Sequence, residues 1–380
     1  MSDASLARMP ATADRSPGRS LTARIASSPA FQRWASGVPV LRRFVRAEGE
    51  AIFDVVAGFL HSQVLHALVE LDVLGLLAKG PRPVPELARL TGVPERRMEI
   101  LVRAGVALGL LKFHRKTNLA LTNRGAALLG VPGLLPMIAH HSVLYRDMAD
   151  PSAFFRCETE PELAGFWPYV FGPGATIDPD AARRYSDLMA DSQGLVAEET
   201  LRAVSLKGVR RLLDVGGGSG AFLAAAAKKW PHLDGTLFDL PQVAPAAEAR
   251  FATDLLSRRI TTVAGNFRSE PLPPGADAIS LVRVLYDHSD ETIAALLSKV
   301  HAALPKGGRV IVSEPMTGGT RPNRPGDAYF ALYCLAMGTG KARSPHEICL
   351  RLGEAGFSEV RHVPTYRSFV TSVVTAVRAA

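Results

Sequence analysis

This chain has few cysteines, and their number and positions exclude several kinds of site. Cys157, Cys334 and Cys349 are the three cysteines in 380 residues. Their small number and the lack of paired spacing fit neither a disulfide framework nor a zinc site. We therefore expect a reducing, cytoplasmic location and no metal site.

Long apolar runs and concentrated charge are also missing. The longest apolar stretches, near residues 51–60 and 279–286, are shorter than the roughly 20 residues of a membrane-spanning helix. No apolar region follows the first arginines, as it would in a secretory signal. The net charge of +8 is spread along the chain rather than gathered into a basic block that would favour nucleic acid.

What the chain does have is a glycine-rich turn between a strand and a helix. Residues 211–215 predict the end of a buried strand, and residues 221–229 have strong helix-forming composition. Four glycines lie between them, within residues 216–220. Glycines let the backbone approach a ligand closely, and the N–H groups of the helix face it. The turn therefore indicates a site for a charged ligand that carries a nucleoside.

The glycine turn is compatible with two cofactors. Gly216, Gly218 and Ala221 fit the dinucleotide fingerprint, and Asp239 lies near the spacing of its ribose-binding acid. Asp214 lies just before the glycines, which also fits S-adenosylmethionine. An acid there can bind the ammonium group of that cofactor, directly or through water, and would repel a pyrophosphate.

From about residue 210 onward the sequence alternates between strands and helices, which predicts an α/β fold with a doubly wound parallel sheet. Ligands of such sheets bind at the carboxyl ends of the strands. The expected strands are 211–215, 235–238, 260–264, 278–284 and 309–312, followed by a last pair at 360–364 and 369–377.

The N-terminal half contains a winged-helix pattern. A helix, a turn at 91–93, a second helix from about residue 94 and two short strands at 112–114 and 119–122 follow one another. A DNA-reading helix needs basic and amide groups along its exposed face, but Glu95 and Glu99 lie among the arginines here. Dimer contacts are the better expectation, and DNA binding stays open as an alternative.

Several motifs together resemble one enzyme family. They are Leu-Asp-Val-Gly-Gly-Gly-Ser-Gly at 213–220, Phe-Asp-Leu-Pro at 238–241, Gly-Asn-Phe at 265–267 and Gly-Gly-Arg-Val-Ile-Val-Ser-Glu at 307–314. The ordered set is similar to the S-adenosylmethionine-dependent O-methyltransferases that join a winged-helix dimerisation domain to a cofactor domain. The resemblance covers roughly residues 50–375.

The resemblance implies a class I methyltransferase sheet, a homodimer and S-adenosylmethionine as the cofactor. Relatives usually carry an aspartate where this chain has Asn266, so an amide replaces a charge beside the adenine. The implied division of the chain is a mobile or amphipathic segment at 1–48, a winged-helix dimerisation domain at 49–132, a helical linker and substrate lid at 133–206, and the methyltransferase domain at 207–380. The expected cofactor-binding residues are Asp214, Gly216, Gly218, Gly220, Asp239, Leu240, Asn266, Phe267 and Arg283.

The catalytic position departs from the pattern of the family. Relatives that methylate phenols carry His-Asp-Trp where this chain has Tyr-Asp-His at 286–288. A histidine with a pKa near ~6.5 can take a phenol proton, whereas a tyrosine near ~10 is a poor base. The acceptor is therefore expected not to be a phenol, with alignment of its oxygen as the main contribution to rate. Tyr286, His288 and Glu314 are the candidate catalytic residues, and which of the first two acts stays open.

One branch of the family fits best. Arg-Val-Leu-Tyr-Asp-His at 283–288, the aromatic helix expected over 327–337 and Phe-Gln-Arg-Trp at 31–34 resemble the hydroxycarotenoid O-methyltransferases of phototrophic bacteria. That branch implies methylation of the tertiary 1-hydroxyl of an acyclic carotenoid, on the route to spheroidene and spirilloxanthin. Its partners would be a small apolar hydroxylated substrate and, peripherally, the inner or intracytoplasmic membrane, with no nucleic acid. The alternatives are another apolar acceptor (a polyketide, quinone or tetrapyrrole) and a winged-helix regulator with a vestigial cofactor domain.

Overall fold

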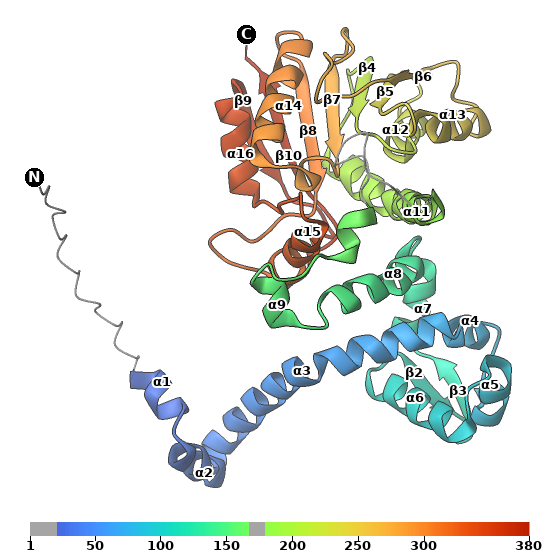
Figure 1. Ribbon diagram of the computed structural model, residues 1–380, viewed down its shortest axis with the longest axis vertical. Helices are drawn as coiled ribbons and strands as arrows, with labels where there is room; N and C mark the ends of the chain where they lie inside the picture. Colours follow the sequence, from blue (N-terminus) through green and yellow to red (C-terminus); the bar gives the residue numbers. More distant parts are fainter. Residues whose placement is uncertain (1–20, 167–178, 380) are drawn as a thin grey trace, which may run out of the picture. The chain divides into compact units, whose positions relative to one another are not determined.

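The computed structural model describes residues 21–166 and 179–379. The aromatic segment expected at 166–171 lies largely outside the described residues. The chain divides into two units, one ending at Val64 and one beginning at Leu65, and each is described by itself. Figure 1 shows the order of the elements along the chain.

The first unit consists of helices. Ser28 caps α2, where its hydroxyl accepts a hydrogen bond from the Phe31 N–H at 3.4 Å. The long helix α3 passes through Gly49 and Gly58 without a break. The helices are α1 (Leu21–Ala26), α2 (Pro29–Gly37) and α3 (Pro39–Glu70).

The continuity of α3 corrects the expectation about membrane-spanning length. By length and composition alone, its segment Leu41–Glu70 is long and apolar enough to cross a bilayer. The end of the helix is packed into protein, however: His66 and Leu68 are buried. Composition alone therefore does not make α3 a membrane span.

The second unit begins with the predicted winged helix. Gly92 takes a left-handed conformation (φ +70°) between the two helices of the motif, which explains the glycine there. The three short strands pair in the order β1-β3-β2. The elements are α4 (Val73–Ala78), β1 (Arg82–Pro83), α5 (Val84–Thr91), α6 (Glu95–Ala107), β2 (Leu111–His114) and β3 (Asn118–Leu121).

A series of helices links the winged helix to the large sheet. The buried carboxylate of Asp147, at the end of α8, accepts hydrogen bonds from the backbone N–H groups of Glu162 and Leu163. This contact fixes the 3₁₀ turn η1 against α8. The linking elements are α7 (Asn123–Gly130), α8 (Leu134–Asp147), α9 (Pro151–Phe155), η1 (Glu162–Phe166) and α11 (Pro179–Ala203).

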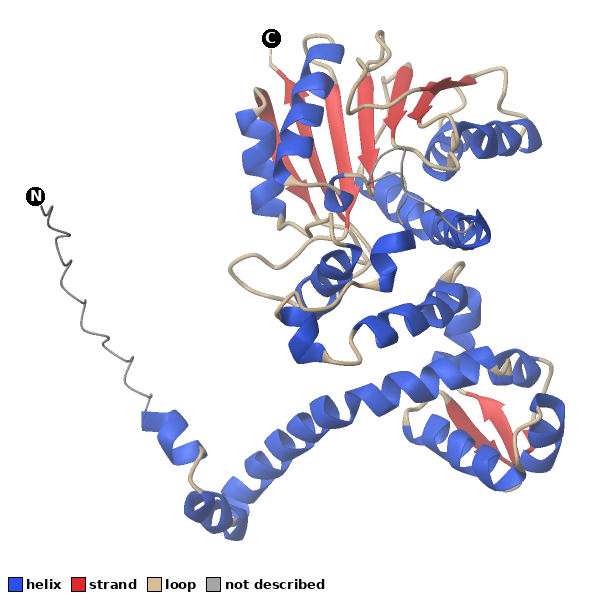
Figure 2. Ribbon diagram, in the orientation of Figure 1, coloured by secondary structure: helices blue, strands red, loops and turns tan. Residues whose placement is uncertain are grey.

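The large sheet has seven strands in the order β6-β5-β4-β7-β8-β10-β9. The first five in this order are parallel, as predicted, whereas β10 runs antiparallel to both of its neighbours. Figure 2 shows the twisted sheet with helices beside it. The strands are β4 (Arg211–Val215), β5 (Asp234–Asp239), β6 (Ile260–Ala264), β7 (Ala278–Val282), β8 (Arg309–Glu314), β9 (Phe357–Val363) and β10 (Ser372–Arg378).

Two apolar layers cover the sheet. One contains buried side chains of α11, α12 (Ala221–Lys229) and α13 (Ala244–Thr253), and the other contains those of α14 (Asp290–Ala303) and α16 (Pro345–Glu354). Strand β7 is buried along its whole length, as expected for a central parallel strand covered on both faces. The carboxyl ends of the parallel strands form the edge at which polar groups gather.

A buried chain of hydroxyl groups attaches α11 to the sheet. The Thr200 hydroxyl lies 2.6 Å from that of Ser313, which lies 2.9 Å from the hydroxyl of Thr371. Ser313 is on β8, next to Glu314. These bonds fix the position of α11 beside the carboxyl ends of the strands.

Candidate functional site at the carboxyl ends of the strands

The glycine turn has little space for side chains. A Cβ at Gly217 would lie 2.5 Å from Oδ2 of Asp214, and a Cβ at Gly220 would lie 2.4 Å from the ring of Phe251. Gly216, Gly218 and Gly220 also have positive φ angles of 66°, 57° and 74°. Steric crowding and backbone conformation together require glycine here.

Asp214, the last residue but one of β4, is fully buried beside this turn. One carboxylate oxygen accepts a hydrogen bond from the Ser280 hydroxyl at 2.6 Å, while the other has no hydrogen-bond partner in the structure. Burial raises the pKa of Asp214 to about 7; the charge of Asp239 adds to the rise, and the Ser280 hydrogen bond opposes it. An unpaired buried carboxylate oxygen is suited to a cationic donor such as an ammonium group.

Asp239 connects the end of β5 to the glycine turn. Its two carboxylate oxygens accept hydrogen bonds from the backbone N–H groups of Gly218 and Leu240, both at 2.7 Å. Burial raises the pKa of Asp239 against the effect of these two bonds. Its position after the second strand of the glycine-turn motif is that of a ribose-binding acid.

The loop after β6 carries Asn266 and Phe267. The side-chain oxygen of Asn266 accepts a hydrogen bond from the Arg268 N–H at 2.9 Å, which makes a local turn. The ammonium group of Lys299 donates to the carbonyls of Phe267, Arg268 and Glu270 at 2.6, 3.1 and 2.8 Å. Asn266 thus shapes the loop and Lys299 fixes it, leaving the ring of Phe267 half-buried.

Arg283 follows β7 in a strained backbone conformation, with a φ of +58°. Its guanidinium donates to the Ser192 hydroxyl of α11 at 2.8 Å and to the Tyr286 phenol oxygen at 3.4 Å. Left-handed backbone in a non-glycine residue costs on the order of 1 kcal/mol and is found most often at functional sites. Here the strain places Arg283 between α11 and Tyr286.

The structure separates the two candidate bases. Tyr286 is buried and packs with Cys334 and Ala342, whereas His288 lies edge-on to Phe267 with 5.3 Å between ring centroids. Tyr286 therefore lies beside the helix that contains Cys334, α15 (Ala331–Met337). His288 lies beside the loop after β6.

Neither side chain has a pKa suited to a base that removes a proton from an alcohol. Burial raises the pKa of Tyr286 well above its ordinary value. Burial, with the nearby charges of Arg268 and Arg343, lowers the pKa of His288 to about 4. Nδ1 of His288 faces the Arg268 guanidinium at 3.1 Å, so it serves as an acceptor there and the ring is neutral.

Two buried carboxyl groups accompany Tyr286. Glu314 accepts a hydrogen bond from the Tyr286 N–H at 3.2 Å, and its other oxygen has no partner in the structure. Burial raises the pKa of Glu314 to about 7, an effect that the charge of Arg343 opposes. Asp287 also has one unpaired buried oxygen, and burial raises its pKa well above the ordinary value against the charge of Arg283.

Arg343 holds the segment that contains these groups. Its side chain is almost fully buried (1% exposed). It donates to the carbonyls of Leu285 and His288 at 3.0 and 2.9 Å and pairs with Asp290 at 2.9 Å. One buried cation therefore fixes the whole turn after β7.

Two histidine–tyrosine pairs join α8 to the C-terminal helical segment. His141 lies 2.7 Å from the Tyr329 hydroxyl, and His140 lies 3.2 Å from the Tyr333 hydroxyl. Tyr329 belongs to a π-helical turn, Gly326–Phe330, that continues into α15, Ala331–Met337. The adjacent histidines thus contact two tyrosines one helical turn apart, and no cluster of metal ligands occurs among the described residues.

Sequence patterns missed several members of this site. Ser280 could have been recognised as the one polar residue in the apolar strand Ala-Ile-Ser-Leu-Val. Lys299 and Arg343 give no local signal, because their partners are backbone carbonyls that only the folded chain brings near. His140 and His141 are adjacent, but their tyrosine partners lie 193 and 188 positions away, so local sequence does not reveal the contacts.

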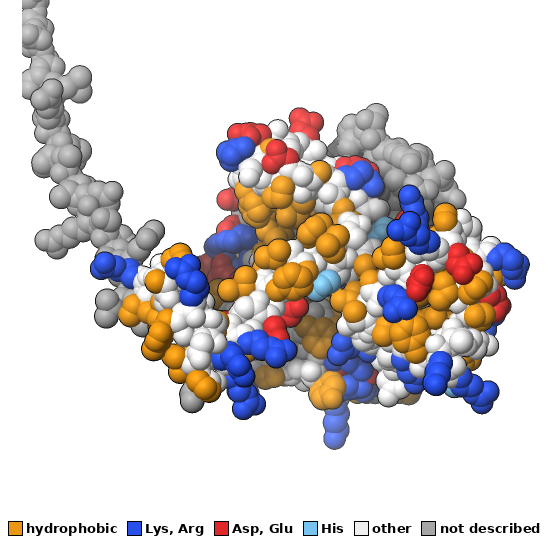
Figure 3. Space-filling model, turned by 90° about the horizontal axis from the view of Figure 1, so that it is seen from below, with side chains coloured by type: hydrophobic (Ala, Val, Ile, Leu, Met, Phe, Trp, Pro, Cys, Tyr) orange, Lys and Arg blue, Asp and Glu red, His pale blue; other side chains and the backbone are white. Residues whose placement is uncertain are grey.

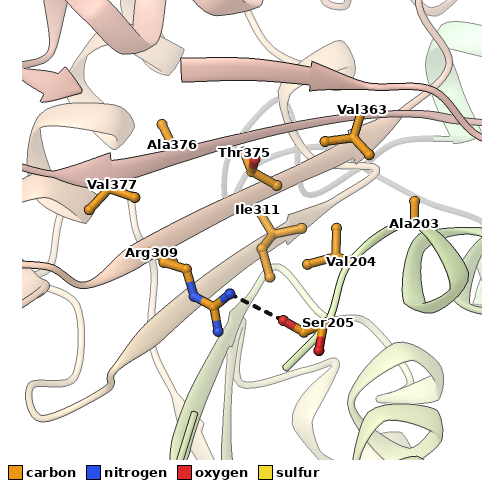
Figure 4. A pocket seen from close by; sticks show the side chains of 9 residues that line it. All are labelled: Ala203, Val204, Ser205, Arg309, Ile311, Val363, Thr375, Ala376 and Val377. Atoms are coloured by element: carbon orange, nitrogen blue, oxygen red, sulfur yellow. Dashed lines mark hydrogen bonds between the residues drawn. The ribbon is translucent and has the colours of Figure 1, made fainter. Parts of the chain in front are cut away.

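A pocket of about 190 Å³ elsewhere on the sheet has a different character. Figure 4 shows it between the end of α11 and strands β8 to β10, where Arg309 donates to the Ser205 carbonyl at 3.1 Å. Arg309 begins β8, so the pocket lies away from the strand end that carries Glu314. Its lining includes Ile311 and Thr375 but no carboxylate, which does not suit a cationic nucleoside.

The sequence and the fold of this chain are similar to those of known proteins. Residues 145–358 match the family model of the O-methyltransferase domain, and residues 53–130 match that of the O-methyltransferase dimerisation domain. The chain is 57% identical to demethylspheroidene O-methyltransferase of Cereibacter sphaeroides over 94% of each sequence. It is 52% identical to the protein of that name from Rhodobacter capsulatus, over 97% of this chain and 92% of the relative. Human N-acetylserotonin methyltransferase, solved with S-adenosylmethionine, has the same fold: the TM-score is 0.74 at 23% identity, covering 88% of this chain and 98% of that one.

The protonation of Asp214 predicts a stability change that depends on pH. Its pKa is about 7 in the fold and 3.8 ordinarily, so ionisation costs stability as pH rises from 3.8 to 7, and the cost is constant above that. Asparagine carries no such cost. We expect Asp214→Asn to stabilise the ligand-free protein by about 3 kcal/mol more at pH 8 than at pH 5.

Urea unfolding at the two pH values measures this difference, and Asp234→Asn on the exposed start of β5 is the matched control. An equal effect of Asp214→Asn at pH 5 and pH 8 would contradict the assignment.

Proposed function

This chain belongs to the S-adenosylmethionine-dependent O-methyltransferases that carry a dimerisation domain, and we propose that its acceptor is the tertiary 1-hydroxyl of an acyclic hydroxycarotenoid. The observation that carries the acceptor assignment is identity of 52–57% to two demethylspheroidene O-methyltransferases over nearly the whole chain. The family is established independently by the two domain matches.

The cofactor fits the residues at the carboxyl ends of β4, β5 and β6. The unpaired oxygen of Asp214 can accept from its ammonium group, and Asp239 can accept from the ribose hydroxyls once Gly218 and Leu240 have positioned it. The loop of Asn266 and Phe267 offers an amide and a ring to the adenine. When bound, the cofactor supplies a methyl group on a positively charged sulfur.

The acceptor oxygen is assigned to the neighbourhood of Tyr286. Arg283 and Tyr286 are polar groups beside an otherwise apolar surface that includes Cys334, Phe330 and Ala331. An apolar polyene suits such a surface, while the phenol and guanidinium can hydrogen bond to a hydroxyl. The aromatic side chains of the π-helical turn and α15 extend the apolar region.

The reaction forms an oxygen–carbon bond, breaks the sulfur–carbon bond and releases the hydroxyl proton. A tertiary alcohol is far less acidic than a phenol, so its proton is lost only as the new bond forms. Glu314 has an unpaired buried oxygen beside Tyr286 and a pKa of about 7, so its ionised form can receive that proton. Alignment of the acceptor oxygen by Arg283 and Tyr286 is then the main contribution of this site to the rate.

This mechanism predicts mild effects at both candidate bases. We expect Tyr286→Phe to lower kcat by less than about tenfold, because Arg283 still aligns the acceptor and the phenol does not remove its proton. His288→Ala should chiefly raise the KM for S-adenosylmethionine, because His288 packs on Phe267. Steady-state kinetics on the purified variants measure both effects, with the exposed Tyr366→Phe as the control. A loss of kcat of about a thousandfold in either variant would identify a general base.

We also propose that two copies pair through the exposed face of α3. The chain carries a dimerisation domain, and α3 displays apolar side chains at the i, i+3, i+4, i+7, i+8 spacing of one helix face. An apolar helix face of this size is normally covered in an assembly. The members are Ile52, Val55, Val56, Phe59 and Leu60, each 54–75% exposed.

A charge placed on this face should separate the copies. We expect the Val55→Asp, Phe59→Asp double variant to sediment as a monomer, since two carboxylates would be buried unpaired at the interface. Analytical ultracentrifugation measures this, and Leu255→Asp, at a side chain 88% exposed, is the control. An unchanged mass for the double variant would contradict this interface.

The acceptor is tested directly with labelled S-adenosylmethionine. We expect label in a methoxy product when a detergent-dispersed 1-hydroxy acyclic carotenoid is offered, and none with the same carotenoid lacking the hydroxyl. Asp239→Ala should abolish the transfer, because the cofactor loses its ribose contact. Transfer to a polyketide, quinone or tetrapyrrole but not to the carotenoid would overturn the acceptor and keep the family.

A further inference from the structure

The N-terminal helices differ sharply in charge from the rest of α3. Residues 21–46 contain five arginines and no acidic residue, whereas residues 47–78 contain five acidic residues and neither lysine nor arginine. The boundary lies within α3, shortly before Glu48. The arginines are Arg24, Arg33, Arg42, Arg43 and Arg46, and all of them are exposed.

Large apolar side chains accompany these arginines on the surface. Trp34 is 59% exposed and Phe44 is 66% exposed, and the ring of Phe31 lies 5.8 Å from that of Trp34. Leu41, Phe44 and Val45 recur at helical spacing along the start of α3. Figure 3 shows hydrophobic and basic side chains interleaved over the N-terminal helices.

We propose that residues 21–46 form a docking surface for an anionic lipid bilayer, which we call the basic N-terminal surface. An amphipathic helix with arginine beside tryptophan and phenylalanine lies in the membrane interface, where the rings enter the headgroup layer and the arginines meet lipid phosphates. The proposal rests on the proposed function in one respect: a carotenoid acceptor is dissolved in such a bilayer.

Other occupants suit this surface less well. Residues 21–46 precede the stretch that matches the dimerisation domain, residues 53–130, so a second copy is not the expected occupant. The acidic, arginine-free part of α3 would in turn be repelled by an anionic bilayer, which limits the lipid contact to residues 21–46. A helix that crossed the bilayer would have to bury Glu48, Glu50 and Asp54, which is costly.

The surface is tested by flotation of the full-length protein with vesicles. We expect binding to vesicles with about 30% phosphatidylglycerol in phosphatidylethanolamine, at least about tenfold weaker binding to phosphatidylcholine, and loss of binding as salt rises from about 0.1 to 0.5 M. Arg33→Glu, Arg42→Glu, Arg43→Glu should reduce binding more than about tenfold. The control is the same charge reversal at the exposed arginines Arg89, Arg96 and Arg97. Trp34→Ala should weaken binding without changing its salt dependence.

Methylation measured in two media separates this proposal from the proposed function. The triple variant should methylate a detergent-dispersed carotenoid as the wild type does and should lose activity on carotenoid held in phosphatidylglycerol vesicles. Methylation in detergent without any vesicle binding by the wild type would overturn the docking surface alone. Vesicle binding without methylation in either medium would overturn the carotenoid acceptor alone. Loss of dimer mass in the triple variant, with vesicle binding unchanged, would assign the surface to a second copy and overturn the proposal.

Discussion

The candidate site depends on carboxyl groups that are buried at the ends of parallel strands. Asp214 and Glu314 are both completely inaccessible to solvent, and each has an oxygen with no partner in the structure. An unsatisfied buried polar group costs about 1–3 kcal/mol, and more when it is charged. A sheet covered on both faces would not retain such groups for its own stability. In the proposed function, the cationic cofactor and the hydroxyl acceptor complete them.

Cationic side chains from elsewhere in the chain make this edge of the sheet rigid. Arg343 holds the turn after β7 through two carbonyls and Asp290, and Lys299 holds the loop after β6 through three carbonyls. Arg283 connects α11 with Tyr286 and has a strained, left-handed backbone conformation. Arg343 and Lys299 therefore bind backbone groups of the chain itself. Side chains from other parts of the chain thus fix the backbone of both loops.

Local sequence pattern encodes only part of this site. A strand, a glycine turn and a helix are contiguous, and a parallel sheet brings its strand ends together, so Asp214, Asp239 and Glu314 could be placed at one edge from the residues alone. Arg343 could not, because it lies 55 positions beyond His288, whose carbonyl it binds, and only the path of the loop brings the two together. A last pair of strands was predicted, but the antiparallel direction of β10 was missed, because the alternation of strands and helices does not reveal the direction of a final hairpin.

Proton release on cofactor binding tests the central claim, that the ammonium group of the cofactor pairs with the buried carboxylate of Asp214. At pH 6.5 an α-amino group is charged, and a carboxyl with a pKa of about 7 is mostly protonated. Binding of S-adenosylhomocysteine should therefore expel about 0.8 proton from the wild type, and much less from Asp214→Asn. Calorimetry in buffers of different ionisation enthalpy measures this number. Equal proton release from the two proteins would show that Asp214 is not the group that the cofactor completes.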